Sequence, residues 1–388
     1  MLIYPLGIMK KLYFGAAALV VLAGAIAITL LSKQMVDTES TTADSDIIVS
    51  KDPPIILVHG FNQSSNFWDD VGLVGALADR NTILMGDYFS ENDSNNGLVT
   101  LRNPIEIIKG QTALYTITFP QNGTSDLRDS AIMLEKAIQQ VTARHRCDKV
   151  KLITFSAGGV ISRQYITDHV SDHKVASLIT VSSPHLGSEH AWLAESFRNA
   201  KSYTASLKSS DGNFITKPTK RGTAYLMEKT LGQLEDWSHN TGIDINSRAA
   251  IMLTNPESGN YLDLLSRADH PADITYHSII TEENILTYGW TELRNDWGKV
   301  AGNDFSNTDL MNMFLDLGRN GLGKLDKISD QFTSMKFRGD GVVSKHSQNI
   351  NNIHAFQNSD ALNAGITHLK SEHGSSEMKG AILDALYQ

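Results

Sequence analysis

The fold of this chain is decided by the stretch Val150-Lys151-Leu152-Ile153-Thr154-Phe155-Ser156-Ala157-Gly158-Gly159. An apolar run leads directly to Ser156, and small residues follow it. Such a run is typical of a strand buried on both faces of a parallel sheet. A serine at a sharp turn between such a strand and a helix is held in a strained conformation with its hydroxyl exposed. Ser156 is therefore expected to be a nucleophile, and the N–H of Ala157 is expected to face a tetrahedral oxyanion.

The usual pattern at such a turn is Gly-x-Ser-x-Gly, and this chain departs from it at one position. Thr154 stands where the first glycine is expected, whereas Gly158 and Gly159 keep small residues on the helix side. A serine that merely caps an ordinary helix is the alternative interpretation.

A second segment favours the catalytic interpretation. Residues 55–58 read Ile-Ile-Leu-Val, which predicts another buried strand, and His59, Gly60 and Phe61 follow it directly. A glycine there allows a sharp turn, so that the N–H of Phe61 can supply a second donor to an oxyanion. The alternative is a His-Gly turn without a role.

The segments around these two stretches alternate between short apolar runs and amphipathic stretches. This alternation predicts βαβ units and a mainly parallel sheet flanked by helices. Between 189 and 272 and between 282 and 334 the periodicity is weak, and we expect these insertions to form a cap or lid. The remaining predicted strands are 82–85, 114–119, 175–181, 274–280 and 335–337, and the predicted helices are 68–80, 126–145, 158–170 and 378–387.

The N-terminal segment, residues 1–34, has the pattern of an export signal. Lys10 and Lys11 precede the apolar residues 12–31, a run long enough to span a bilayer as one helix. Whether it is a cleaved signal peptide or a membrane anchor stays open. Residues 35–52 are rich in Ser, Thr and Asp, which predicts a flexible linker. The catalytic domain is expected to span residues 53–388.

The composition narrows the function classes further. The chain has 388 residues, a formal net charge of −9, and no long run of Lys or Arg, so a nucleic-acid partner is not expected. A single cysteine, Cys147, excludes an intramolecular disulfide and any cysteine-clustered metal site. We expect neither a cofactor nor a metal.

Four segments in the same order resemble lipases and esterases of the α/β-hydrolase superfamily. They are residues 54–61, 150–159, 183–188 (Ser-Pro-His-Leu-Gly-Ser) and 339–344 (Gly-Asp-Gly-Val-Val-Ser). The resemblance implies an α/β-hydrolase fold with cap insertions. It also implies a Ser-His-Asp triad in which the acid and then the histidine follow the serine along the chain.

The acid is the first of the two remaining triad positions. Asp340 fits it because it follows a predicted strand, lies between two glycines and matches the Asp-Gly-x-Val segment of these lipases. Asp326, Asp330 and Asp360 are rivals without that resemblance. A solvated turn aspartate is the alternative interpretation of Asp340.

Four histidines follow Asp340 and compete for the role of the base. His346 is only six residues further on, and His354 lies in an Asn-rich stretch without family resemblance. His368 lies in Gly-Ile-Thr-His-Leu ahead of the last predicted helix, which resembles the Gly-x-x-His-Leu loop of lipases. We therefore assign His368 as the base, with His373 as runner-up.

Together these patterns predict an exported serine hydrolase. We expect it to cleave carboxylic esters, lipids or similar apolar esters above all, through an acyl-enzyme on Ser156. The N-terminal segment also predicts association with a membrane. The alternatives are an acyltransferase of the same fold and a non-catalytic binding module that has lost turnover.

Overall fold

The structure is a computed structural model, and it describes most of the chain after the N-terminal segment. The described residues are 52–90, 99–105, 110–119, 126–188, 191, 247–254, 259–282, 343–371 and 373–388.

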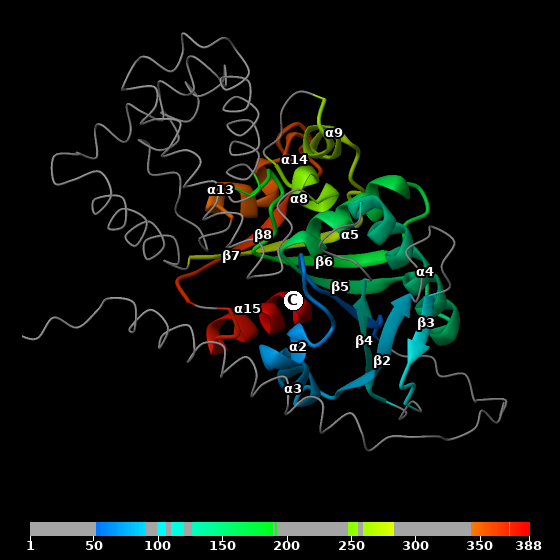
Figure 1. The fold of residues 1–388 in the computed structure, drawn as a ribbon. Helices are drawn as coiled ribbons and strands as arrows, with labels where there is room; N and C mark the ends of the chain where they lie inside the picture. The colour runs from blue at the N-terminus through cyan, green and yellow to red at the C-terminus, as the bar shows by residue number, and fades with distance from the viewer. Residues whose placement is uncertain are drawn as a thin grey trace, which may run out of the picture. The chain divides into compact units, whose positions relative to one another are not determined.

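An eight-stranded sheet in the order β3-β2-β4-β1-β5-β6-β7-β8 forms the centre of this part of the chain (Figure 1). All neighbouring strands are parallel except β2 and β3, which are antiparallel. The strands are β1 (Ile55–Val58), β2 (Thr82–Ser90), β3 (Val99–Arg102), β4 (Thr112–Thr118), β5 (Val150–Phe155), β6 (Val175–Val181), β7 (Thr275–Thr281) and β8 (Ala364–Leu369).

The register of the sheet determines which loops meet. Val58 at the end of β1 pairs with Thr154 near the end of β5, and Phe155 pairs with Val181 at the end of β6. Because parallel strands end at the same edge of a sheet, the turns after β1, β5 and β6 lie side by side. This edge carries the candidate site.

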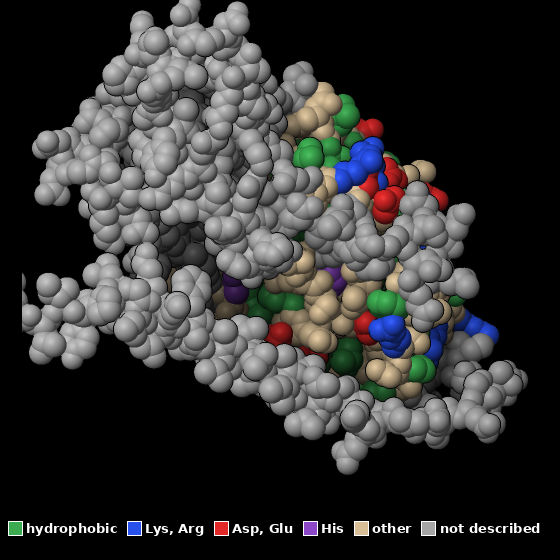
Figure 2. Space-filling view, viewed as in Figure 1, with side chains coloured by type: hydrophobic (Ala, Val, Ile, Leu, Met, Phe, Trp, Pro, Cys, Tyr) green, Lys and Arg blue, Asp and Glu red, His purple; other side chains and the backbone are tan. Residues whose placement is uncertain are grey.

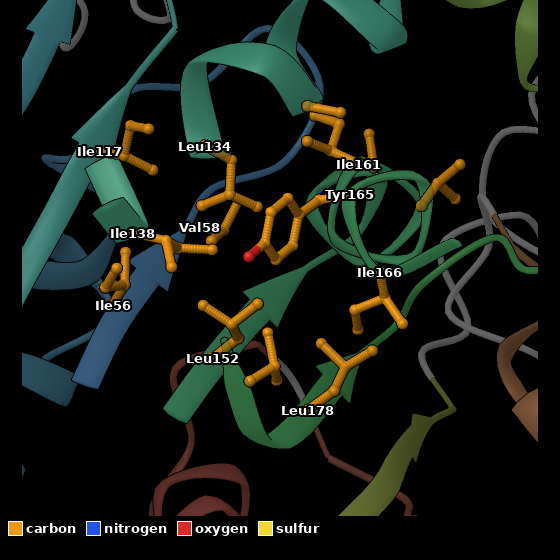
Figure 3. Close-up of a cluster of buried hydrophobic side chains, with 14 of the residues drawn as sticks. Ile56, Val58, Ile117, Leu134, Ile138, Leu152, Ile161, Tyr165, Ile166 and Leu178 are labelled. Atoms are coloured by element: carbon orange, nitrogen blue, oxygen red, sulfur yellow. The ribbon is translucent and has the colours of Figure 1, made fainter. Parts of the chain in front are cut away.

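One face of the sheet is covered by α4 (Leu127–His145), α5 (Ala157–Asp168), α8 (Arg248–Met252), α9 (Tyr261–Arg267) and α14 (His354–Gln357), which bury apolar side chains against it. The ring of Tyr165 on α5 lies among Leu134, Ile138 and Val58 (Figure 3). Burial of one such large side chain stabilises the fold by about 1.5–3 kcal/mol.

The opposite face packs against α2 (Phe67–Asp70), α3 (Leu73–Ala78) and the C-terminal helix α15 (Ser376–Tyr387). Trp68, Leu73 and Ile382 are fully buried in this second apolar cluster. Both faces of the central strands are therefore apolar, which is why Ile55–Val58 reads as a continuous apolar run. The short elements α13 (Lys345–Gln348) and η4 (Ile350–Asn352) lead into α14.

The predicted strands and helices from residue 114 to residue 181 and at the C-terminus are confirmed, with ends shifted by a few residues. The prediction of one helix over 68–80 was wrong. Gly72 adopts a left-handed conformation (φ 69°) and separates α2 from α3. Strand β3 was not predicted, and β2 is longer than predicted.

Several predictions fall outside the described residues. These are the N-terminal segment, the linker apart from its last residue, the strand at 335–337 and most of both insertions. The first insertion ends in described structure, where α8 and α9 pack into the main apolar core.

Among the described helices, none is long and apolar enough to cross a membrane. Acidic and basic side chains are interspersed on the described part of the face in Figure 2.

Candidate active site

Ser156 occupies the turn between β5 and α5 in a strained backbone conformation. Its φ of 49° and ψ of −124° place a residue with a side chain where glycine is favoured. Its N–H donates to the carbonyl of Val181 at 2.8 Å, so the turn is fixed to the end of β6. The residue is partly exposed, whereas Phe155 and Ala157 on either side are buried. This is the geometry that the sequence predicts for an exposed nucleophilic hydroxyl.

Close packing explains the small residues after Ser156. A Cβ atom added to Gly158 would lie 2.5 Å from the carbonyl oxygen of Val58 and 2.6 Å from that of His59. The first turn of α5 therefore lies directly against the end of β1. Thr154, the departure from the usual motif, is fully buried and donates its hydroxyl to the carbonyl of Ile179 at 3.1 Å. Strand β6 thus accommodates the threonine without disturbing the turn.

The loop after β1 comes close to the nucleophile. A Cβ atom added to Gly60 would lie 2.9 Å from the Cβ of Ser156. The N–H of Gly60 donates to Oε1 of Gln63 at 2.9 Å, which closes the loop. Within the described residues, the N–H of Phe61 has no acceptor. The N–H of Ala157, at the start of α5, has no acceptor inside its helix, so both predicted oxyanion donors lie in segments that meet at Ser156.

His59 holds the loop after β1 in place from inside the protein. The ring is fully buried, and its Nδ1 lies 2.9 Å from the carbonyl oxygen of Gly60. Its Nε2 accepts the N–H of Phe119 at 3.2 Å, so Nδ1 carries the proton in the neutral ring. Burial lowers the pKa of His59 to about 4, which keeps the ring neutral. His59 therefore links the end of β1 to the end of β4 and fixes the carbonyl beside Phe61.

His373 lies at this edge of the sheet. Its ring meets that of Phe155 edge to face, with 4.8 Å between centroids and an interplanar angle of 89°. Its Nε2 lies 2.9 Å from Oγ of Ser182 and 3.4 Å from Oγ1 of Thr281. The ring thus packs on the residue before Ser156 and hydrogen-bonds at the ends of β6 and β7.

His368 lies elsewhere. The prediction that Gly365–Leu369 forms a loop was wrong, because residues 364–369 form the edge strand β8. Within that strand His368 pairs with Ile280 and is exposed to solvent. Side chains alternate along a strand, so His368 points to the same face as Ile366, which packs on the main core. The structure does not bring His368 to Ser156.

The other candidates for base and acid are separated from Ser156 or undescribed. His346 on α13 and His354 on α14 are both exposed. Asp360 precedes β8, and therefore lies at the opposite edge of the sheet from Ser156. Asp340, Asp326 and Asp330 lie outside the described residues.

A buried arginine on the nucleophile helix was missed by the sequence reasoning. Arg163 is fully buried, and burial lowers its pKa to about 10. Its guanidinium donates to the carbonyls of His185 (3.3 Å) and Leu265 (3.1 Å) and to Nε2 of His270 (3.3 Å). It therefore fastens α5 to the loop after β6 and to the end of α9. The signal available in the sequence was a basic residue between two apolar pairs, Val160-Ile161 and Tyr165-Ile166, of a helix predicted to pack on the sheet.

Among the described residues, no group of three or more His, Cys, Asp or Glu side chains could hold a metal ion. The polar groups that meet at the site are hydroxyls, the imidazoles of His59 and His373, and backbone N–H groups. This set suits nucleophilic attack on a carbonyl and stabilisation of the oxyanion that follows.

The sheet order and the strained serine turn between β5 and α5 give this part of the chain an α/β-hydrolase fold. The family model of palmitoyl protein thioesterases matches residues 54–228, which include both the β1 loop and the serine turn. A search of curated proteins gave no match.

Three solved structures illustrate the similarity. The mature lipase BlEst2 of Bacillus licheniformis is 18% identical, with 88% of this chain and 94% of that chain covered and a TM-score of 0.44. The lin2722 product of Listeria innocua is 12% identical, with 87% and 94% covered and a TM-score of 0.46. Lipase 1 of Pelosinus fermentans is 14% identical, with 87% and 99% covered and a TM-score of 0.41.

Proposed function

We propose that this protein is a serine hydrolase that cleaves carboxylic esters or thioesters through an acyl-enzyme on Ser156. The observation that carries the proposal is the strained turn at Ser156, pressed against the glycine loop that presents the N–H of Phe61. A non-glycine residue persists in such a conformation only where the surrounding structure enforces it, and such residues cluster at active sites.

The proposed base is His373 rather than His368. His373 packs on Phe155 and reaches the ends of β6 and β7, whereas His368 is exposed on the edge strand. Thr281 at the end of β7 pairs with Leu369 at the end of β8. The loop that carries His373 therefore starts beside the end of β7, and His373 is the fourth residue after Leu369. Asp340 remains the proposed acid on the basis of its sequence resemblance.

In the proposed reaction, His373 accepts the hydroxyl proton as Oγ of Ser156 attacks the ester carbonyl. The N–H groups of Phe61 and Ala157 stabilise the oxyanion of the tetrahedral intermediate. The imidazolium then gives its proton to the leaving alcohol or thiol, and the acyl group stays on Ser156. Water, deprotonated by the same imidazole, attacks the acyl-enzyme and releases the acid.

The proposed substrates have apolar acyl chains. This rests on the similarity to lipases and on the match to palmitoyl protein thioesterases, both named for acyl esters or thioesters. Comparing hydrolysis of p-nitrophenyl esters and acyl thioesters of increasing chain length tests it. A preference for long chains is expected, and a preference for acetyl esters would contradict it.

Single alanine variants test the proposed machinery. Ser156→Ala and His373→Ala should each lose about 10⁴–10⁶ in turnover, because triad members act as a unit. His368→Ala is the matched control and should keep wild-type activity. Full activity in His373→Ala, combined with loss in His368→Ala, would overturn the assignment of the base.

The proposed location is outside the cytoplasm, on the basis of the basic and apolar pattern of residues 1–34. Cell fractionation should find the native protein in the cell envelope or the medium. Its recovery in the cytosolic fraction would contradict export.

A further inference from the structure

Three hydroxyl groups follow one another along the edge of the sheet that carries the site. Ser156 follows β5, Ser182 follows β6, and Thr281 ends β7. The N–H of Ser156 donates to Val181 at 2.8 Å, and the N–H of Ser182 donates to Ile279 at 3.1 Å. The backbones at the three strand ends are therefore fixed relative to one another.

The second and third of these hydroxyls bind the proposed base. Oγ of Ser182 lies 2.9 Å from Nε2 of His373 and 2.7 Å from Oγ1 of Thr281. Ser182 is 1% exposed and Thr281 is 0% exposed, so neither hydroxyl can rely on bulk water for a partner. Gln348 clamps the backbone of Thr281, accepting its N–H at 2.8 Å and donating to its carbonyl at 3.3 Å.

The backbone of Ser182 is strained, as is that of Ser156. Its φ of 52° lies in the left-handed region, where a side chain costs conformational free energy and glycine does not. For the backbone alone, glycine would be the better residue at this position. The strained position is therefore occupied by a serine whose hydroxyl contacts the proposed base, His373.

From these contacts we infer that Ser182 is a positioning residue for His373, with Thr281 holding its hydroxyl in place. When the hydroxyl of Ser182 donates to Nε2, the imidazole proton is confined to Nδ1. That tautomer is the one in which Nε2 can accept the proton of Ser156. The edge-to-face contact with Phe155 holds the ring against the residue that precedes the nucleophile. Rotation of the ring then exchanges Oγ of Ser182 for Oγ of Ser156 as the partner of Nε2.

This inference rests on the proposed function, and the pH dependence of kcat/KM tests it. A hydrogen bond donated to the neutral imidazole disfavours its protonation. Ser182→Gly and Ser182→Ala should therefore both raise the apparent pKa of the base by about half a unit to one unit. On the acid side of the profile, kcat/KM should fall about threefold to tenfold.

Other charged groups must stay in place for the profile to report on the hydroxyl. A substitution at Ser182 changes none of them. The titratable and charged side chains on the elements around His373 are Asp69 and Asp70 on α2, Lys151 on β5, Tyr276 and His277 on β7, His368 on β8, and Glu377, Lys379, Asp384 and Tyr387 on α15. Glu282 paired with Lys345, and Lys370, follow β7 and β8, and the proposed acid Asp340 lies outside the described residues.

The two variants separate positioning from simple structural support. Both variants lose the hydroxyl, but only Ser182→Gly also relieves the backbone strain, so its unfolding midpoint should exceed that of Ser182→Ala. Ser183→Ala is the matched control, because the Ser183 hydroxyl contacts the carbonyl of Val181 and not His373. An unchanged acid limb in both Ser182 variants would overturn the inference, and so would an equal shift in the control.

Failure of this inference is distinguishable from failure of the proposed function. If Ser156→Ala or His373→Ala keeps wild-type turnover, the proposed function fails and the positioning role fails with it. If both of those variants are inactive while the Ser182 variants retain the wild-type acid limb, only the positioning role is wrong.

Discussion

Replacing Gly60 by alanine crowds the loop after β1 against the serine turn. The new Cβ would lie 2.8 Å from Oε1 of Gln63, 2.9 Å from Cβ of Ser156 and 3.0 Å from a ring carbon of Phe155. Non-bonded carbon atoms prefer a separation of about 3.5–4.0 Å. The backbone of residue 60 must therefore retreat from Ser156 by about 0.5–1 Å, since the serine turn is held by β6 and cannot yield as easily.

The N–H of Phe61 moves with that backbone and loses its alignment with the oxyanion. Loss of one oxyanion donor costs about 10²–10³ in kcat, and we expect Gly60→Ala to fall in that range. Crowding in a packed region should also reduce the free energy of unfolding by about 1–3 kcal/mol. Hydrolysis of p-nitrophenyl esters measures kcat, and urea denaturation measures stability.

Gly75→Ala supplies the matched control for this experiment. Gly75 lies within α3, and an added Cβ would meet no atom within 4 Å. Alanine there should stabilise the helix by about 0.5–1 kcal/mol and leave kcat unchanged. A folded Gly60→Ala protein with wild-type kcat would refute the placement of the oxyanion site in this loop.

Three further predictions concern stability. Burial lowers the pKa of both His59 and His145 to about 4, so the unfolded chain binds protons at a higher pH than the folded protein does. The free energy of unfolding should therefore fall as the pH drops from about 6.5 to about 4. Urea denaturation at several pH values measures this fall, and a flat profile would contradict it. Arg163→Lys should lower the free energy of unfolding by about 1–3 kcal/mol for each buried carbonyl left unpaired, because an ammonium group cannot reproduce the forked donors of a guanidinium. Equal stability of the variant in urea would contradict a stabilising role for the hydrogen bonds of Arg163. Tyr115→Phe removes the 2.7 Å hydrogen bond to Nε2 of His145 and should lower the free energy of unfolding by about 1–3 kcal/mol. An unchanged urea midpoint would show that this hydrogen bond does not stabilise the protein.

The local parts of the site could be predicted from the sequence. An apolar strand, a serine and small residues in direct succession specify the turn at Ser156, because each signal concerns neighbouring residues. The sharp turn at Gly60 after β1 could be predicted for the same reason, because it depends on adjacent residues. What the sequence could not show is the register in which Val58 pairs with Thr154, which brings the two turns together.

The base was harder to predict because its environment is assembled from distant segments. Ser182 and His373 are 191 residues apart, and their hydrogen bond leaves no local pattern. Strand β8 was mistaken for a loop because an edge strand needs no continuous apolar run. Gly365 also favoured the prediction of a loop, because glycine is common in loops. In the structure its lack of a side chain makes room for the ring of His277 on the neighbouring strand.

Fluorophosphonate labelling followed by mass spectrometry of the labelled peptide shows directly whether Ser156 is the nucleophile. Only a serine activated by its surroundings reacts rapidly with such a probe. We expect a single phosphonylated residue, Ser156, and no labelling of Ser156→Ala under conditions in which that variant is folded. A phosphonyl adduct on another residue, or undiminished labelling of Ser156→Ala, would contradict it.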